Sequence, residues 1–381
     1  MMWEIAKLGD ISKNIQTGPF GSQLHQSDYS ECGIPVVMPK DLVGGKISEE
    51  SIARVDKTHV ERLCRHKIEV GDILYSRRGD VGRCAHVTKK EEGWLCGTGC
   101  LRVTIDSEKA DSRFVFFQLQ HPDTVGWVEK HAVGATMLNL NTTILSSVPI
   151  RLPALEIQKR IADILSAYDD LIENNQRQIK LLEEAAQRLY KEWFVDLRFP
   201  GHENTKIVDG VPEGWSRGLL KELISVNYGK DHKKAPDDGN IPVYGSGGLM
   251  RKCNKSLFSG EAVLIPRKGS LNNIMYVDET FWTVDTMFYA TMKQPHTAIF
   301  VYFFVKSFDM YSMNIGAAVP SMTTKILDAM NVLIPKDEIL GKFDKQAKVC
   351  FDKIKTLQRQ NEQLRKARDL FLPKLMSGEA V

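Results

Sequence analysis

Arginine and lysine side chains gather in short turns bounded by glycine, where they could neutralise phosphate groups. The turn Ser76-Arg-Arg-Gly-Asp-Val-Gly-Arg83 carries three arginines, and between Glu61 and Lys90 eight basic residues stand against four acidic ones. Both side chains bind phosphate oxygens, and the arginine fork can also donate two hydrogen bonds to guanine in the DNA major groove. For any one of these residues the alternative is a solvated surface loop. The candidate DNA contacts are Arg77, Arg78, Arg83, Arg251, Lys252, Arg267 and Lys268.

The motifs of a catalytic centre are missing from the sequence. It contains no Pro-Pro pair, and hence no Asn/Asp-Pro-Pro-aromatic run of an adenine methyltransferase. It also lacks a Walker motif, a nucleophile elbow and a His-Glu-x-x-His pair. Asp237 and Asp238 follow a proline and have no acid-x-Lys partner close downstream, so we expect a turn there. The residues predict a chain that reads nucleic acid without modifying it, and no catalytic residue is expected.

Three cysteines and one histidine could be considered as zinc ligands, but their spacing does not support a zinc site. Cys84 and His86 precede Cys96 and Cys100, yet no second pair at the close spacing of zinc ligands is present. The seven cysteines form no even framework of disulfide partners. We expect reduced thiols, no metal and no cofactor bound by this chain.

The chain repeats itself at an offset of 182 residues. Ile241-Pro-Val-Tyr also echoes Ile34-Pro-Val-Val, and the run from Gly260 to Gly269 echoes the run from Gly71 to Gly79. A repeat of this kind predicts two copies of one structural unit, with loops that differ between them. The pairs at the offset of 182 are Gly134-Ala135 with Gly316-Ala317, Thr142 with Thr324, Ile144-Leu145 with Ile326-Leu327, Pro153 with Pro335, Glu156-Ile157 with Glu338-Ile339, and Gln176-Arg-Gln178 with Gln358-Arg-Gln360.

Two long helices are predicted, one at the end of each copy. The stretch from Pro153 to Trp193 has no glycine and no proline after its first residue, and a second helix is expected from Asp337 to about Leu372. Both show the three-and-four spacing of an amphipathic helix, so they most simply bury their stripes against each other. The first stripe consists of Ile157, Ile161, Ile164, Tyr168, Leu171, Ile172, Ile179, Leu182, Ala185 and Leu189, and the second of Ile339, Phe343, Ala347, Cys350, Ile354, Leu357, Leu364 and Phe371.

Composition bounds the remaining possibilities. A chain of 381 residues with 43% hydrophobic and 26% charged residues is typical of a globular protein with two or three domains. No apolar run is long enough for a membrane span, and the first residues do not resemble a signal peptide. We expect a cytoplasmic protein without a membrane partner. A net charge of +3 does not identify a partner by itself.

The repeat and several short sequence motifs resemble those of the specificity subunit of type I restriction-modification enzymes. The matching stretches run from Asn139 to Asn141, from Val148 to Gln158, from Trp193 to Glu203, from Val211 to Trp215, from Gly260 to Ser270 and from Leu372 to Glu379, and the last three are the specific ones. The resemblance implies two target recognition domains that each read half of a bipartite, asymmetric site in double-stranded DNA. It also implies an antiparallel coiled coil that docks two methyltransferase subunits. Those subunits would use S-adenosylmethionine, and motor-nuclease subunits would complete the enzyme. The second copy has Leu340 where the family has glutamine.

The prediction is therefore an α+β chain with a pseudo-twofold repeat, in which two strand-rich recognition domains are separated by two long helices. Two alternatives stay open: a coiled-coil adaptor that binds only proteins, and a self-sufficient DNA-modifying enzyme. An adaptor would show no salt-dependent affinity for DNA. The predicted segments are a first recognition domain at 1–152, a first spacer helix at 153–197, a linker at 198–214, a second recognition domain at 215–335, and a second spacer helix with the C-terminal tail at 336–381.

Overall fold

A computed structural model describes residues 3–134, 137–314 and 320–379. Ala135, Gly316 and Ala317, which the repeat pairs, lie outside the described residues. The chain divides into two compact units, which we describe separately. The first unit combines Met1–Asn174 with Gln360–Val381, and the second consists of Asn175–Arg359. Each unit therefore holds one strand-rich segment and a portion of both long helices.

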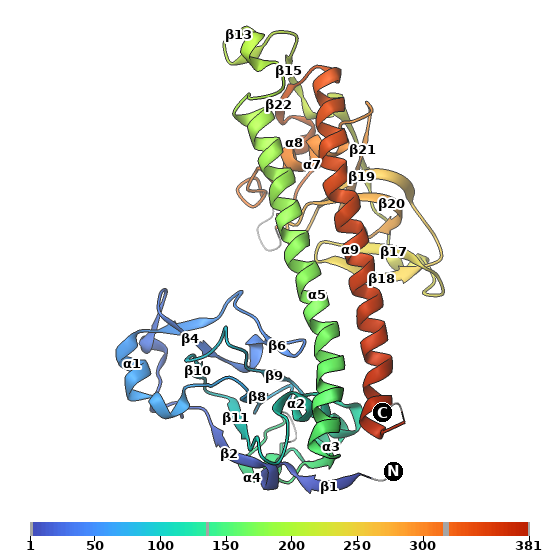
Figure 1. The fold of residues 1–381 in the computed structure, drawn as a ribbon. Helices are drawn as coiled ribbons and strands as arrows, with labels where there is room; N and C mark the ends of the chain where they lie inside the picture. Colours follow the sequence, from blue (N-terminus) through green and yellow to red (C-terminus); the bar gives the residue numbers. More distant parts are fainter. Residues whose placement is uncertain (1–2, 135–136, 315–319, 380–381) are drawn as a thin grey trace. The chain divides into compact units, whose positions relative to one another are not determined.

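The first unit is built on two four-stranded sheets (Figure 1). One has the strand order β2-β11-β8-β9 and is antiparallel throughout. The other has the order β10-β4-β7-β3, with β10 parallel to β4. The strands of these sheets are β2 (Ser12–Thr17), β11 (Cys100–Ile105), β8 (Ile73–Ser76), β9 (Cys84–His86), β10 (Leu95–Cys96), β4 (Ile34–Val37), β7 (Ala53–Val55) and β3 (Tyr29–Ser30).

Two smaller strand pairs and four helices complete the strand-rich part of the first unit. Helix α2 begins where the Asp111 carboxylate accepts the backbone N–H groups of Arg113 and Phe114, and it packs beside β9. The strand pairs are β1 (Glu4–Lys7) with β12 (Pro149–Leu152) and β5 (Leu42–Val43) with β6 (Lys46–Ile47). The helices are α1 (Lys57–Arg62), α2 (Ser112–Gln120), α3 (Pro122–His131) and α4 (Thr142–Ser146).

The second unit is built on one six-stranded sheet in the order β16-β21-β19-β20-β17-β18. Helix α7 packs against β19 and β20 (Figure 1), and its eight residues from Ala298 to Val305 are all buried. The sheet strands are β16 (Ile224–Tyr228), β21 (Met287–Met292), β19 (Phe258–Pro266), β20 (Met275–Thr283), β17 (Ile241–Gly245) and β18 (Gly248–Cys253). The other elements are β13 (Ile207–Val208) with β14 (Val211–Pro212), β15 (Ser216–Leu219) with β22 (Asn331–Ile334), α6 (Leu220–Leu223), α7 (Ala298–Lys306) and α8 (Thr324–Asp328).

The predicted internal repeat is present in the strand topology. The antiparallel order β2-β11-β8-β9 of the first unit recurs as β16-β21-β19-β20 in the second. The pair β1–β12 corresponds to β15–β22, and the parallel pair β4–β10 corresponds to β17–β20. The copies differ where strands are added, since β3 and β7 extend a separate sheet in the first unit, whereas β18 extends the common sheet in the second.

The long helices are α5 (Leu155–Tyr190), followed by a π-helical turn at Lys191–Val195, and α9 (Asp337–Ser377). In the first unit, Arg368 of α9 donates to Asp169 of α5 at 2.5 Å. In the second unit, the ring of Phe343 lies 6.3 Å from that of Tyr190 and 6.0 Å from that of Trp193. The Tyr168 ring lies 6.3 Å from the Phe371 ring, so the residue number rises along α5 as it falls along α9, and within each unit the two helices run antiparallel (Figure 1).

The buried face of α5 differs in part from the predicted stripe. Ile164, Leu171 and Ala185 were placed on the stripe but are exposed, whereas Ala162, Leu165 and Ala186 are buried. The buried positions follow a seven-residue repeat that runs from Gln158 through Leu165 and Ile172, and a helix pair needs that 3.5-residue period. Polar residues occupy two buried sites, Gln158 and Asn175, so the apolar pattern alone did not show the period. On α9, Ile339, Phe343, Ala347, Ile354 and Leu357 are buried as predicted, and Phe371 is exposed.

Candidate nucleic-acid interface

The first basic turn, residues 76–83, is held by main-chain hydrogen bonds as it leaves β8. The Arg77 N–H donates to the Gly99 carbonyl at 2.8 Å, and the Leu140 N–H donates to the Arg77 carbonyl at 2.8 Å. The Gly79 N–H donates to the Leu138 carbonyl at 3.0 Å. Gly79 has a φ of +77°, a conformation that glycine adopts without strain. The turn is therefore fixed between β11 and the segment that precedes α4.

The second basic turn, residues 267–270, leaves β19 in the same way. The Arg267 N–H donates to the Thr286 carbonyl at 2.8 Å, and the Met322 N–H donates to the Arg267 carbonyl at 2.9 Å. Gly269, with a φ of +88°, donates to the Pro320 carbonyl at 3.3 Å. The partners 138 and 140 of the first turn lie 182 residues before the partners 320 and 322 of the second. The same set of main-chain hydrogen bonds, which we call the backbone clamp, therefore holds the basic turn in each unit.

The side chains of the first turn differ in how they are used. The Arg77 guanidinium is half-buried, and its Nε donates to the Leu140 carbonyl at 3.3 Å. Arg78 is exposed, and Arg83 is exposed in an ion pair of 2.6 Å with Asp80. A solvated pair of this kind contributes about 0.2–1 kcal/mol, so a phosphate can replace the Asp80 carboxylate at little cost.

The second turn holds its arginine against an aromatic ring. The Arg267 guanidinium carbon lies 5.4 Å from the centroid of the Tyr228 ring, and Nη1 donates to the Asp285 carbonyl at 3.3 Å. The Tyr228 ring meets the Phe288 ring edge-on at 5.1 Å and is 54% exposed. Lys268, the next residue, is exposed.

Arg251 is used within the fold, although it was predicted as a DNA contact. Its guanidinium donates to the Asp237 carboxylate and to the carbonyls of His232 and Ala235. These contacts tie β18 to the loop that precedes β17, so Arg251 has fewer donors to offer to DNA than the other candidates. Lys252 is exposed on β18.

Two glycines that sequence reasoning did not single out as a pair start the loops beside the turns. Gly18 follows β2 and donates to the Cys100 carbonyl at 2.9 Å, and Gly229 follows β16 and donates to the Met287 carbonyl at 3.0 Å. A Cβ at either glycine would lie 2.0 Å from a backbone carbonyl oxygen. In each copy the glycine directly follows a strand, β2 or β16. An aromatic residue is close in sequence, since Phe20 lies two residues after Gly18 and Tyr228 directly precedes Gly229.

The aromatic candidates separate into exposed and packed residues. Phe20 is 53% exposed, and Tyr228 is exposed to a similar extent. Tyr75 is fully buried, and the Tyr244 hydroxyl donates to Glu279 at 2.6 Å. Phe20 and Tyr228 thus remain available for contact with a base, whereas Tyr75 packs in the core.

The cysteine region is packed as core. Burial raises the pKa of the Cys84 and Cys96 thiols to about 12, and it raises the pKa of Cys100 as well. Burial lowers the pKa of His86 to about 4, and its Nε2 lies 3.0 Å from the Ser112 hydroxyl. Within the described ranges no group of three His, Cys, Asp or Glu residues could hold a metal ion. These thiols stay protonated at neutral pH.

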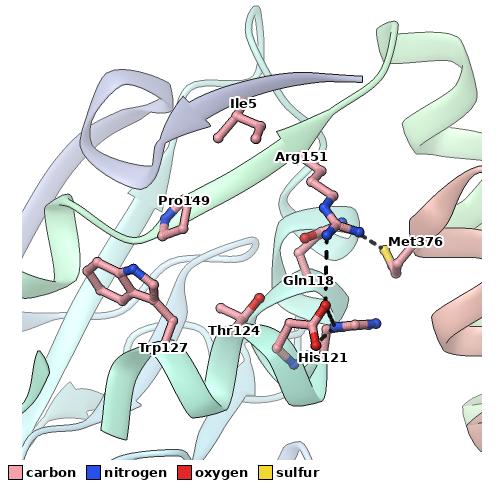
Figure 2. A pocket seen from close by; sticks show the side chains of 9 residues that line it. Ile5, Gln118, His121, Thr124, Trp127, Pro149, Arg151 and Met376 are labelled. Carbon is pink, nitrogen blue, oxygen red and sulfur yellow. Dashed lines mark hydrogen bonds and ion pairs between the residues drawn. The ribbon is translucent and has the colours of Figure 1, made fainter. Parts of the chain in front are cut away.

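A cavity of about 210 Å³ in the first unit lies among β1, β12, α2, α3 and the end of α9 (Figure 2). Arg151 and Asp123 face each other across it at 3.8 Å. His121 caps α3, because its Nδ1 accepts the Asp123 N–H at 3.2 Å. The Gln118 amide lies 3.3 Å from the Met376 sulfur. The ion pair links α3 to β12, and the Gln118–Met376 contact links α2 to the end of α9.

Comparison with known proteins identifies relatives over both copies. The family model described as "Type I restriction modification DNA specificity domain" matches residues 2–184 and again residues 212–368. The chain is 25% identical to the type I restriction enzyme MjaIX specificity subunit of Methanocaldococcus jannaschii, over 99% of this chain and 93% of the relative. It is 23% identical to the type I restriction enzyme HindI specificity subunit of Haemophilus influenzae, over 99% of each chain.

A solved structure has a similar fold. The crystal structure of the S subunit of a type I restriction-modification system from M. genitalium aligns with a TM-score of 0.64 at 18% sequence identity. The alignment covers 98% of this chain and 96% of that one. This similarity concerns the fold alone, and it covers both strand-rich copies and both long helices.

Proposed function

The chain belongs to the type I restriction modification DNA specificity family, and we propose that it recognises a bipartite, asymmetric DNA site. Each strand-rich segment reads one half of the site. We call residues 3–152 the first reader and residues 215–335 the second reader. Because the loops differ between the readers while the scaffold is shared, the two half-sites have different sequences.

The duplicated backbone clamp is the observation that carries this proposal. In each reader it fixes a basic turn at the end of a sheet strand, and an exposed aromatic residue lies within two residues of the tightly packed glycine, Gly18 or Gly229, in a neighbouring loop. A fixed turn can present donors to DNA in one orientation, which sequence recognition needs and phosphate neutralisation alone does not. The proposed DNA contacts are Arg77, Arg78, Arg83, Lys252, Arg267 and Lys268.

Partner subunits would supply the chemistry. We propose that the chain has no catalytic centre of its own and docks two methyltransferase subunits, which bind S-adenosylmethionine, with motor-nuclease subunits completing the complex. Apolar side chains left exposed on the long helices support this docking, because covering apolar surface with a partner removes it from water. On α5 these are Ile164, Leu171 and Leu181, and on α9 they are Val349, Leu370 and Phe371.

We place the protein in the cytoplasm, where its DNA substrate is found. Among the described helices, none combines the length and the apolar character that crossing a bilayer would require.

Methylome sequencing tests the proposal. A host that expresses this chain with its methyltransferase should carry methylated adenine in one bipartite motif, and the purified complex should lose DNA affinity steeply as salt rises. Affinity for the methyltransferase without salt-dependent affinity for DNA would instead identify a protein adaptor. Methylation of DNA by the purified chain with S-adenosylmethionine alone would identify an enzyme.

A further inference from the structure

Arg77 and Arg267 occupy the same position in the two readers. Each is the first residue after the strand that enters the basic turn. Each donates its N–H to the carbonyl of the residue directly before the neighbouring strand begins, Gly99 before β11 or Thr286 before β21. Each also accepts a hydrogen bond from the segment before a short helix, at Leu140 or Met322. Because the backbone is the same, any difference between these arginines arises from their side-chain surroundings.

Those surroundings differ at one position. In the second reader, β16 ends at Tyr228 beside Phe288, and the Tyr228 ring supports the Arg267 guanidinium. The first reader has Thr17 at the corresponding place, since β2 ends there and Gly18 follows as Gly229 follows Tyr228. In the first reader, the Arg77 side chain instead donates Nε to the Leu140 carbonyl.

We propose that Arg267 is a specificity-determining residue that reads a guanine in the second half-site, and that Tyr228 is the positioning residue that orients it. Two contacts already orient the side chain, a cation–π contact with the Tyr228 ring and a hydrogen bond from Nη1 to the Asp285 carbonyl. The other N–H groups of the guanidinium remain to donate to guanine O6 and N7 as a planar fork. This inference rests on the proposed function.

The support from Tyr228 favours a base contact over a phosphate contact. A phosphate can accept hydrogen bonds from a flexible cationic side chain in many directions. Lys268, the residue after Arg267, is exposed and suited to that role. A base edge requires the donors in one plane and direction, so restricting the side chain before binding lowers the entropy lost on contact. Tyr228 is itself held by the edge-on Phe288 ring and by the tightly packed Gly229.

The test uses the full complex and five variants of the chain. We would compare Arg267→Gln, Arg267→Lys, Tyr228→Ala, Tyr228→Phe and Lys268→Ala by methylome sequencing and by competition binding with single-base variants of the site. Loss of a bidentate guanine contact should lower discrimination at one position of one half-site by about 5- to 150-fold in Arg267→Gln. Arg267→Lys should lose most of that discrimination, although the charge is kept.

The other variants separate positioning from charge and from folding. Tyr228→Ala should relax the same position by a smaller factor, and Tyr228→Phe should behave as the parent chain because the ring is retained. Lys268→Ala should weaken all sequences equally and reduce the salt slope by about one. Thermal unfolding of each complex would show whether a variant is folded.

Two results would overturn the inference. Uniform weakening by Arg267→Gln with an unchanged motif would make Arg267 a phosphate contact, and an unchanged motif with unchanged affinity would leave it in solvent. Either result, obtained while the parent complex methylates a bipartite motif, would leave the proposed function standing. A parent complex that methylates no bipartite motif would overturn the proposed function itself.

Discussion

Substituting Gly229 with alanine should destabilise the second reader by forcing apart two pieces of backbone. An ideal Cβ there lies 2.0 Å from the Val284 carbonyl oxygen and 2.7 Å from the Thr283 carbonyl oxygen. Both residues are already hydrogen-bonded, because the Lys230 N–H donates to Thr283 and the Val284 N–H donates to Tyr244. The carbonyl oxygen of Val284 must move away from the new Cβ atom by about 1 Å, and these hydrogen bonds oppose that movement.

The cost follows from that geometry. Overpacking against backbone costs about 1–3 kcal/mol, and one weakened hydrogen bond adds about 1 kcal/mol. For a unit of this size, a loss of about 2–4 kcal/mol corresponds to a fall in Tm of roughly 5 to 15 °C. Gly247→Ala is the matched control, because a Cβ at Gly247 meets nothing within 4 Å and its φ is not positive.

The assay is thermal unfolding of the purified full complex, combined with methylation of sites altered in one half. Gly229→Ala should lower the midpoint of the second unit and weaken recognition of the second half-site, whereas Gly247→Ala should change the Tm by only a few degrees. Equal effects of the two substitutions, or none from Gly229→Ala, would show that the close approach at Gly229 does not constrain the loop.

Three further outcomes are expected. Arg78→Glu should weaken binding to all DNA sequences and reduce the salt slope, as measured by titration at several salt concentrations. Arg251→Ala should lower the Tm through the loss of its contacts with the loop before β17 while the methylated motif stays the same. Leu171→Lys combined with Leu181→Lys should reduce co-purification of the methyltransferase without changing the fold, whereas Gln187→Lys, at an exposed polar position, should not.

The repeat and the two long helices could be predicted from the sequence because both leave a periodic record in residue types. The packing face of α5 could be predicted only in part. Gln158 is buried because its amide oxygen accepts the Asp111 N–H at 2.9 Å and its nitrogen donates to the Pro153 carbonyl at 2.8 Å. A search for apolar residues alone assigns such a polar residue to the surface. The seven-residue period is therefore not visible at positions where a buried polar side chain forms hydrogen bonds inside the protein.

The candidate site shows the same limit in another form. The basic turns could be found because charge and glycine are visible in the sequence, and the two turns lie at matching places in the fold. The role of Arg251 could not be found, because its acceptors are mainly carbonyl groups of the main chain, which every residue possesses. The support of Arg267 by Tyr228 joins residues 39 positions apart, at the end of β16 and directly after β19, and only the strand order brings them together.

The backbone clamp also explains how one scaffold can serve two different half-sites. Its hydrogen bonds join main-chain atoms only, so residue 78 can be arginine where residue 268 is lysine, and residue 139 can be asparagine where residue 321 is serine. Substitution of these side chains therefore changes what the turn presents without removing a bond that holds it. The glycines are the exception, since Gly79 and Gly269 need a positive φ. If the turns contact DNA as proposed, single substitutions at the turn can change recognition in either reader while the scaffold keeps its stability.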